Sequence, residues 1–317
     1  MISFNAIHTV SLPSSKALAV AVKENRCAAG DRDGFIHIID TQSGQIVRRL
    51  RQHVEFVYTL AFNPDNGHLV SAGKDKSIRE WDIESGNMII DYAGIFSSSA
   101  SAKTMASQKF KPGTRSHTMT ILTIALDKNG LMGTGSQDNR AKLWKNGEPV
   151  RTYDWHTAPV TAVRFQPETH VFFSASKDKT IRSWDDVTGS LIHKYTGHLG
   201  EIVALDFIDA HHFVSCDNDG NVIGWNVDKE SPEEFIYTSS NRLVCAHFHK
   251  ASQCLLLGCE NGTLEVLDLS GGVVKISASC TAQAHQIDVR CIHSDGDLVA
   301  SCDNAGKVVL WNLTREA

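Results

Sequence analysis

Three residues that could bind a metal ion alternate along one short segment of the chain. Cys245, His247 and His249 are separated by single residues, so a β-strand would place all three side chains on one face. Thiolate and imidazole are ligands that Zn²⁺ prefers, and a structural zinc site has four ligands. The sequence offers no visible fourth ligand. We therefore expect ordinary strand residues here, with no metal site and no cofactor.

The sequence lacks the short motifs of common catalytic and nucleotide-binding sites. No GxxxxGK[ST], HExxH, GxSxG or dinucleotide-binding glycine motif occurs. None of the eight cysteines forms a CxxC pair, and residues 1–15 lack the basic start and apolar core of a secretory signal. The cysteines therefore indicate buried free thiols in a reducing compartment. We expect a protein of the cytoplasm, with the nucleus as the alternative.

Composition excludes several functional classes. The content of 42% hydrophobic and 21% charged residues is typical of a soluble globular chain, and no apolar run is long enough to cross a membrane as a helix. The net charge of −5 argues against binding nucleic acid through bulk positive charge. Residues 1–158 carry 19 Lys/Arg and 15 Asp/Glu, whereas residues 159–317 carry 12 and 21. A fold that separates the two halves therefore has a basic side and an acidic side.

Similar segments recur along the chain. Four align without gaps: SAGKDKSIREWD (71–82), TGSQDNRAKLWK (134–145), SASKDKTIRSWD (174–185) and SCDNDGNVIGWN (215–226). Three degenerate copies keep the same frame: AGDRDGFIHIID (29–40), LGCENGTLEVLD (257–268) and SCDNAGKVVLWN (301–312). The tryptophan position falls at Ile39, Trp81, Trp144, Trp184, Trp225, Leu267 and Trp311, in steps of 42, 63, 40, 41, 42 and 44 residues. A regular period of about 40–45 residues indicates a repeat architecture.

Each copy has the pattern of four short strands. In the fourth copy, apolar or alternating runs occupy 160–165, 171–176, 180–184 and 190–195, with a polar turn at 177–179. Tight-hairpin dipeptides occur at Asp33-Gly34, Asp219-Gly220 and Asn261-Gly262. Seven such units arranged radially predict an all-β, seven-bladed β-propeller of four-stranded antiparallel blades, because this arrangement leaves only short, protected sheet edges.

The repeats resemble those of the WD-repeat β-propeller family over nearly the whole chain. The family carries Gly-His before the first strand and Trp-Asp after the third. Gly197-His198 keeps the first dipeptide, and Trp81-Asp82 and Trp184-Asp185 keep the second. Trp225-Asn226 and Trp311-Asn312 are near variants. One such match is a weak signal, whereas seven copies in register strongly favour this fold.

The resemblance implies a buried network of four side chains within a blade. Four sets match: His53–Ser71–Asp75–Trp81, His117–Thr134–Asp138–Trp144, His156–Ser174–Asp178–Trp184 and His198–Ser215–Asp219–Trp225. Blade seven keeps His285, Ser301 and Trp311 but has Ala305 at the aspartate position; blade six has Ser239, Leu257, Asn261 and Leu267; blade one keeps only Asp33. Ser, His and Asp are also the residue types of a hydrolase active site. A set that recurs in four blades, each time beside a tryptophan, fits a buried stabilising network better than a single exposed catalytic site.

The two ends of the chain should close the ring. The last copy ends after its third strand, at 307–313, and residues 2–12 precede the first strand of blade one at 17–22. We expect residues 2–12 to form the outer strand of blade seven, which removes an exposed edge, and residues 1–317 to form one domain. Residues 95–116 break the period as an inserted loop between blades two and three. This loop is either a basic arm for an acidic partner or a passive surface loop.

Partner-binding residues are expected on the face that carries the turns between the second and third strands. The expected contacts are Arg32, Phe56, Tyr58, Lys74, Lys103, Lys109, Lys111, Arg115, Gln137, Lys177, Glu201 and Arg242. Among them, Phe56 is an aromatic anchor of the kind enriched at interface hot spots.

These observations predict a non-enzymatic protein-interaction scaffold, as a subunit or adaptor of a multiprotein complex. The partners expected are proteins or peptides, including acidic segments at blades one to three. No small-molecule substrate and no membrane insertion are expected, and nucleic acid is expected only through a complex. The alternative is a dedicated reader of one short peptide motif, of the histone-tail, phosphorylated or acidic type, at the central opening.

Overall fold

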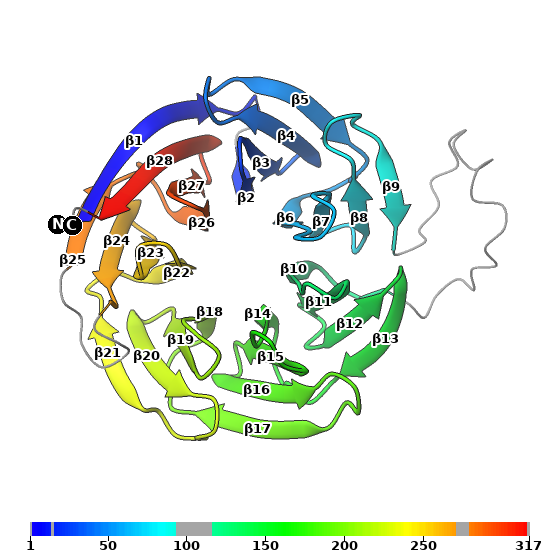
Figure 1. Cartoon of the computed structure of the whole chain (residues 1–317), viewed down its shortest axis with the longest axis vertical. Coiled ribbons are helices and arrows are strands. Elements are labelled where there is room, and N and C mark those ends of the chain that lie inside the picture. The colour runs from blue at the N-terminus through cyan, green and yellow to red at the C-terminus, as the bar shows by residue number, and fades with distance from the viewer. Residues whose placement is uncertain (1, 14–15, 93–115, 271–278, 316–317) are drawn as a thin grey trace, which may run out of the picture.

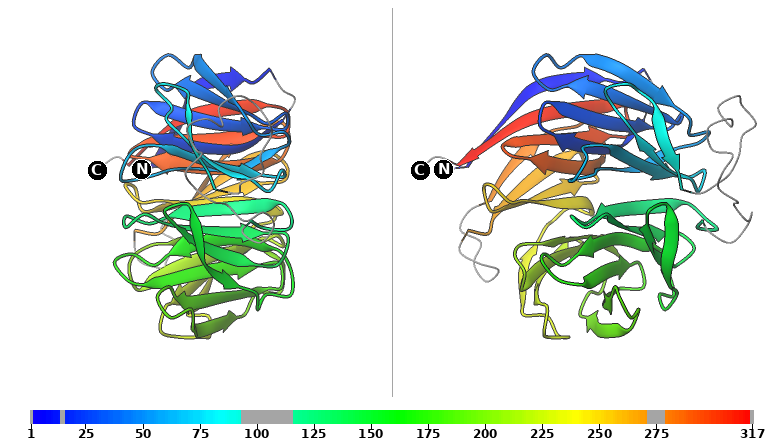
Figure 2. Two further views of the ribbon diagram at one scale, coloured as in Figure 1. Left: turned by 90° about the vertical axis from the view of Figure 1, so that its right-hand side faces the viewer. Right: turned by 45° about the vertical axis from the view of Figure 1, so that its right-hand side comes forward.

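Twenty-eight strands form seven separate sheets in the described part of the chain. The computed structural model describes residues 2–13, 16–92, 116–270 and 279–315. Each sheet is antiparallel and four-stranded, and the sheets stand around a central axis as the blades of a propeller (Figure 1). Seen from the side, the strands run between the two faces of the disc (Figure 2). The predicted all-β, seven-bladed fold is confirmed.

The blades are numbered here in chain order, each from its inner to its outer strand. Blade 1 is β2 (Ala17–Lys23), β3 (Arg26–Asp31), β4 (Phe35–Asp40) and β5 (Ile46–Arg51); blade 2 is β6 (Val57–Phe62), β7 (Leu69–Gly73), β8 (Ile78–Trp81) and β9 (Met88–Asp91). Blade 3 is β10 (Ile121–Leu126), β11 (Leu131–Ser136), β12 (Ala141–Lys145) and β13 (Glu148–Tyr153); blade 4 is β14 (Val160–Phe165), β15 (Val171–Ser176), β16 (Thr180–Asp185) and β17 (Leu191–Thr196). Blade 5 is β18 (Ile202–Phe207), β19 (His212–Asp217), β20 (Asn221–Asn226) and β21 (Glu234–Thr238); blade 6 is β22 (Leu243–His249), β23 (Cys254–Cys259), β24 (Thr263–Asp268) and β25 (Ser279–Gln283). Blade 7 is β26 (Val289–Asp295), β27 (Leu298–Asp303), β28 (Lys307–Arg315) and β1 (Ile2–Ser11).

Burial decreases from the middle strands of a blade to its outer strand. In blade 4, four consecutive residues of β16 are buried, whereas β17 alternates between exposed and partly buried positions. Large aromatic side chains fill the space between neighbouring blades. Trp184, for example, lies 4.7 Å from Tyr153 of blade 3, between ring centroids. The third-strand tryptophans are thus core residues that join one blade to the next.

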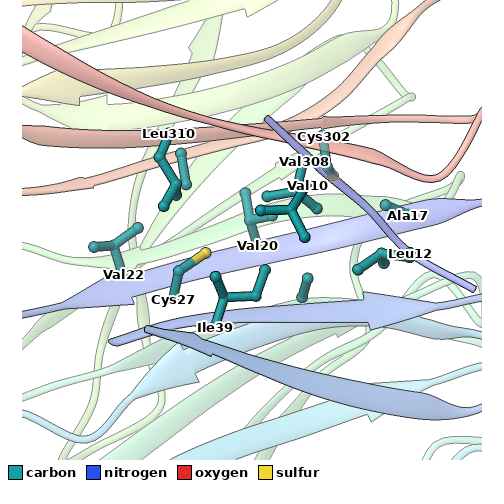
Figure 3. Packing of buried hydrophobic residues seen from close by; sticks show 12 residues of the cluster. Val10, Leu12, Ala17, Val20, Val22, Cys27, Ile39, Cys302, Val308 and Leu310 are labelled. Carbon is teal, nitrogen blue, oxygen red and sulfur yellow. The ribbon is translucent and has the colours of Figure 1, made fainter. Parts of the chain in front are cut away.

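The ring closes through the N-terminal strand, as the sequence predicts. β1 pairs antiparallel with β28, from Ile2 opposite Arg315 to Ser11 opposite Lys307. Val10 and Leu12 pack with residues of blades 7 and 1, including Val308 and Ile39, in one buried cluster (Figure 3). Because this strand supplies both a sheet edge and part of the core, the two ends of the chain hold the ring together.

The inserted segment at 95–116 lies outside the described residues, except for Ser116. The expected partner residues Lys103, Lys109, Lys111 and Arg115 lie outside them as well. Ser116 donates a hydrogen bond from its hydroxyl to the backbone oxygen of Lys76, at 2.5 Å. At Ser116 the chain therefore lies beside the turn of blade 2. No described helix is long and apolar enough to cross a membrane.

Two substitutions on β1 test the closure. Val10 is 8% exposed within the closing cluster, whereas Ile7 on the same strand is 47% exposed. Val10→Asp should lower the free energy of unfolding by about 3 kcal/mol or more, because it removes apolar burial and places a charge in the core. Ile7→Asp should change it by less than about 0.5 kcal/mol. Chemical denaturation of both variants measures the difference, and equal stability of the two would contradict closure by β1.

Candidate functional site: the turn face and the central cavity

One face of the ring carries both the turns between second and third strands and the loops that enter each inner strand. We call it the turn face. Backbone hydrogen bonds tie these turns and loops together in successive blades, as from Lys74 N to Phe56 O and from Lys177 N to Pro159 O. The residue at the same place in every turn has a positive φ, between 64° and 101°: Gly34, Lys76, Asn139, Lys179, Gly220, Gly262 and Gly306. The same tight turn thus recurs in all seven blades.

Five blades tie the loop to the turn through a chain of four side chains, which we call a tetrad. The indole N–H donates to a Ser or Thr hydroxyl at 2.7–2.9 Å. That hydroxyl lies 2.6–2.9 Å from Nε2 of the histidine. Nδ1 of the histidine lies 2.7–3.0 Å from an aspartate oxygen. Because indole can only donate and carboxylate can only accept, the imidazole carries its proton on Nδ1 and accepts the hydroxyl proton at Nε2.

Blades 2, 3 and 4 bring together the residues that the sequence grouped. Their members are His53–Ser71–Asp75–Trp81, His117–Thr134–Asp138–Trp144 and His156–Ser174–Asp178–Trp184. Each hydroxyl is fully buried and already accepts an indole proton. None of these three hydroxyls is therefore exposed to a substrate.

The prediction for blade 5 is wrong in one member. Asp217, not Asp219, holds Nδ1 of His198, at 2.9 Å. One Asp217 oxygen accepts the backbone N–H groups of Asp219 and Asn221, and the other faces the histidine. Asp217 therefore closes the turn and holds the loop at the same time, whereas Asp219 is exposed.

The expectation that blade 7 lacks a carboxylate is also wrong. Asp303 holds His285 at 2.7 Å and accepts the backbone N–H groups of Ala305 and Lys307, so this tetrad is complete without a carboxylate at Ala305. Asp303 occupies the same place as Asp217, two residues after the tetrad serine, with glycine at the φ-positive turn position. The signal was therefore in the sequence, as Ser-Cys-Asp followed by Gly, but the alignment on the later turn residue missed it.

Blades 1 and 6 use other buried pairs. In blade 1, Asp31 binds Nε2 of His37 at 2.8 Å, whereas Asp33 only donates its backbone N–H to Asp31. In blade 6, the buried Glu265 accepts from Ser239 at 2.8 Å and from Asn241 at 2.9 Å. Glu265 thus ties the loop of blade 6 to its third strand in place of a tetrad, a role that sequence reasoning did not identify.

The expected partner residues on blades 1 and 2 gather around one aromatic ring. Arg32 and Lys74 lie 5.4 Å and 4.8 Å from the ring centroid of Phe56, and Tyr58 lies 5.9 Å from it between ring centroids. Lys74 also pairs with Glu55 at 3.0 Å. The structure therefore brings Arg32, Phe56, Tyr58 and Lys74 together as a cluster of two cations and two aromatic rings.

The remaining expected contacts line the central opening. Lys177 pairs with Glu201 at 2.7 Å, and Arg242 lies 4.0 Å from Glu260. With Tyr58, these residues and Gln137 line a cavity of about 1080 Å³ along the axis of the ring. Basic and acidic groups are paired at this opening, so its charge is nearly balanced.

Exposed apolar side chains form a second feature of the turn face, and sequence reasoning missed them. They are Val54, Met119, Trp155, Leu199 and Ile287. Each lies within two residues of a tetrad histidine. The histidine points inward to its hydroxyl, and a neighbour in the same loop points outward. Their position beside the histidines was the signal available in the sequence.

The residues considered for metal binding serve other purposes. His247 lies in a hydrogen-bonded chain with Asp206, at 3.2 Å, and Ser294, at 2.9 Å. Cys245 donates to the backbone oxygen of Val289, and His249 faces Ser252 at 2.6 Å. No group of three or more metal-ligating side chains occurs in the described ranges. The Asp206–His247–Ser294 chain links the inner strands of blades 5, 6 and 7.

Burial and hydrogen bonding shift the pKa values of the tetrad groups. Burial lowers the pKa of His53, His117 and His285 below the ordinary value of 6.5. For Asp217, burial alone would raise the pKa, but hydrogen bonds from His198 and Asn221 outweigh it and lower the pKa to about 2. In blades 2 and 3, where the pKa values of both the histidine and the aspartate are lowered, the tetrad therefore holds a neutral imidazole against an ionised carboxylate at neutral pH.

A family described as "WD domain, G-beta repeat" matches residues 44–82, 147–185, 189–226 and 278–312. The chain is 23% identical over 300 residues to the U3 snoRNP-associated protein-like EMB2271 of Arabidopsis thaliana, covering 89% of this chain and 62% of that protein. It is 29% identical over 189 residues to the nuclear distribution protein PAC1 of Arthroderma otae, covering 58% and 40%. It is 23% identical over 231 residues to the guanine nucleotide-binding protein subunit beta of Saccharomyces cerevisiae, covering 69% and 50%. The chain thus spans 40% to 62% of the length of these relatives.

Among solved structures, the crystal structure of the WD40 beta propeller domain of Doa1 superposes with a TM-score of 0.81 at 18% sequence identity. The match covers 100% of this chain and 98% of that chain. At this identity the similarity establishes the shared fold.

Two alanine variants test which aspartate completes the tetrad of blade 5. Asp217→Ala should lower the free energy of unfolding by about 1–3 kcal/mol, because it leaves buried His198 and turn amides without an acceptor. Asp219→Ala should change it by less than about 0.5 kcal/mol, since that side chain is exposed. Urea denaturation measures both values. The reverse order of stability would restore Asp219 as the tetrad member.

The tetrads should also make stability fall on acidification. The pKa values of His53, His117 and His285 are lowered in the folded chain. The unfolded chain therefore binds more protons at these residues below about pH 6.5, and stability decreases as the pH drops below that value. Each of these three histidines contributes a slope of up to about 1.4 kcal/mol per pH unit. Below about pH 4 four tetrad aspartates add a loss of the same sign, because their folded pKa values are lowered: Asp75, Asp138, Asp178 and Asp217.

Unfolding free energies measured from pH 4.5 to pH 7 test this slope. His53→Gln should reduce it by up to about 1.4 kcal/mol per pH unit. The same change at the exposed His211 serves as the control. If both variants keep the slope of the unmodified chain, His53 is not held neutral in the folded state.

Proposed function

The chain is a WD-repeat β-propeller, and on that premise we propose that it is a non-enzymatic scaffold that binds other proteins on its turn face. It would act as a subunit or adaptor of a multiprotein complex in the cytoplasm or nucleus. It would take no small-molecule substrate and would meet nucleic acid only through such a complex. The observation that carries the proposal is the set of exposed apolar side chains, one beside each tetrad histidine.

These apolar side chains are presented by ordered loops. Val54 and Leu199 are 78% and 77% exposed, and Trp155 is 56% exposed. The backbone N–H of Val54 donates to Asp75 at 3.3 Å, and that of Thr157 donates to Asp178 at 3.1 Å. A surface that is ordered before binding loses little conformational entropy when a partner docks. Trp155 is the strongest anchor, because tryptophan is enriched among interface hot spots.

The basic cluster at blades 1 and 2 supports an acidic segment as the partner there. Arg32 and Lys74 flank Phe56, and only Lys74 has a carboxylate within ion-pair distance among the described ion pairs. A carboxylate approaching the cluster would meet two cations, and its aliphatic neighbours would meet the ring. The excess of basic residues in 1–158 favours the same polarity.

The relatives support membership of an assembly without specifying which. One is named as associated with the U3 snoRNP, and another is named as a subunit of a guanine nucleotide-binding protein. Because the chain spans at most 62% of these relatives, we carry over only the general role of a protein-binding module.

A reader of one short peptide at the central opening is the second candidate. The cavity of about 1080 Å³ favours it, because a side chain of a bound peptide could enter there. Tyr58 and Phe62 are the aromatic residues in the described lining. An opening lined by mixed charges and two aromatic rings argues against a cage for a methylated lysine, which needs several aromatic faces.

A triple variant separates the candidates. Phe56→Ala, Lys74→Glu and Lys177→Glu together should abolish capture of several partners from native lysate, because they remove the aromatic anchor and reverse two charges on the turn face. The control carries Lys128→Glu and Lys250→Glu, in hairpins between the first and second strands, which lie on the opposite face. Partners identified by mass spectrometry are then purified and tested for direct binding.

The pattern of loss decides the outcome. Loss of many partners in the triple variant, with retention in the control, supports the scaffold. Loss of one peptide-containing partner supports the reader. Unchanged direct binding by the triple variant contradicts docking on the turn face, and substrate turnover without any partner contradicts the non-enzymatic role.

A further inference from the structure

Every inner strand carries a β-bulge at the same place, and the seven bulged residues all line the central cavity. They are Leu18, Tyr58, Leu122, Thr161, Val203, Val244 and Arg290. A bulge turns the extra residue out of the regular strand alternation. Six of these seven bulged residues are uncharged, and Arg290 is the one that carries a charge. It lies in β26, one residue after the strand begins at the turn face.

Arg290 lacks a good acceptor in the described structure. Its Nε is buried and has no hydrogen-bond partner. Its nearest carboxylate is Asp288, at 3.5 Å from Nη1, and Asp288 already accepts from Asn304 at 2.6 Å. A buried N–H group without an acceptor costs free energy, and in native proteins such a group calls for an explanation.

Asp288 is the one carboxylate within ion-pair distance of Arg290 in the described structure. Burial raises the pKa values of Cys245 and Cys302 well above the ordinary thiol value, so these neighbours are neutral. Arg242 and Glu260 line the same opening but face each other at 4.0 Å. The side chain of Arg290 is 33% exposed, so a ligand in the cavity can reach the guanidinium.

Arg164, the other arginine on an inner strand of the cavity wall, has different surroundings. Arg164 donates from Nε to Asp206 at 3.2 Å and from Nη1 to the backbone oxygen of Val163 at 2.9 Å. Arg164 is therefore part of the belt that links the inner strands, together with Asp206 and His247. Arg290 has only the 3.5 Å contact with Asp288 among the described ion pairs, and the six other blades place an uncharged residue at its position.

We propose that the central cavity binds the anionic side chain of a peptide, a carboxylate or a phosphate, and that Arg290 is its counter-ion. Guanidinium suits this role because its planar donors match both oxyanions. The inference rests on the proposed protein-binding function and specifies one group that a partner presents. A peptide is favoured over a free ion because the cavity, at about 1080 Å³, is larger than one ion fills and opens among the turn-face residues.

Oriented peptide libraries test the proposal. Peptides with randomised flanks carry glutamate, phosphoserine, serine or lysine at a fixed central position, and binding to the full chain is measured by fluorescence anisotropy at low ionic strength. The unmodified protein should bind the glutamate or phosphoserine library at least tenfold more tightly than the serine and lysine libraries. Inorganic pyrophosphate as competitor distinguishes a free anion from a peptide side chain.

Arg290→Leu is the informative variant, because leucine already occupies the same position in blades 1 and 3. It should keep the melting temperature of the unmodified protein and lose the preference for anionic peptides. Lys250→Leu, on the opposite face, should keep the preference. Arg290→Lys should keep part of it.

Three results would overturn the inference: no anionic preference in the unmodified protein, an unchanged preference in Arg290→Leu, or a melting temperature of Arg290→Leu so much lower that the arginine is a structural residue. If pyrophosphate alone binds as tightly as the libraries, the site takes a free anion and the peptide assignment is wrong. If this inference fails, the proposed scaffold function still stands as long as the turn-face triple variant loses its partners. If that triple variant binds every partner normally, the proposed function itself fails.

Discussion

The structure depends on a directional chain of buried hydrogen bonds that runs from indole to hydroxyl to imidazole to carboxylate. The two ends of this chain have fixed roles, since indole only donates and carboxylate only accepts, so the hydroxyl and the imidazole between them can be satisfied in one direction only. It spans three parts of a blade: the third strand, the second strand, and the loop that enters the inner strand. In five blades it thereby joins the loop to the turn on the same face. Removing one member leaves the others buried and unpaired, so the network stabilises only when complete.

This constraint also determines what the turn face can present. With the histidine pointing inward, its neighbours in the loop point outward, and five of them are apolar and exposed. Blades 1 and 6 lack a tetrad and show none of these exposed residues in their described loops. The same loops thus hold the tetrad histidines on their inner side and carry the proposed docking surface on their outer side. The central cavity follows a separate rule, because its wall is formed by bulged residues that do not take part in the tetrads.

Much of this arrangement could be predicted from the sequence. The spacing of the tryptophan position predicted seven blades, and the missing fourth strand of the last copy predicted closure by residues 2–12, which the pairing of β1 with β28 confirms. The family resemblance also implied the tetrads of blades 2 to 4, whose members the structure brings together. Asp217 could not be predicted in this way, because Asp219 also lies in this turn and only the backbone geometry decides which carboxylate reaches the histidine. Asp303 was missed for another reason: the alignment followed the later turn position, which is Ala305 in blade 7.

Other features depend on contacts between blades, which a single repeat does not reveal. The role of Glu265 requires knowing that Ser239 and Asn241 lie opposite it. That Arg290 is the one charged residue among the seven bulged positions becomes visible only when the inner strands are compared around the ring. Sequence patterns within a repeat predict the blade well, whereas groups that meet across blades need the three-dimensional structure.

Hydrogen–deuterium exchange at the amides of Val54, Thr118, Thr157 and Gly200 tests the central claim most directly. These loop N–H groups donate to the tetrad aspartates, at 2.8–3.4 Å. If the tetrads hold the turn face rigid, these amides exchange nearly as slowly as the inner strands, and Asp178→Ala accelerates exchange at Thr157 but not at Val54. Exchange at the rate of free loops in the unmodified protein would contradict the account.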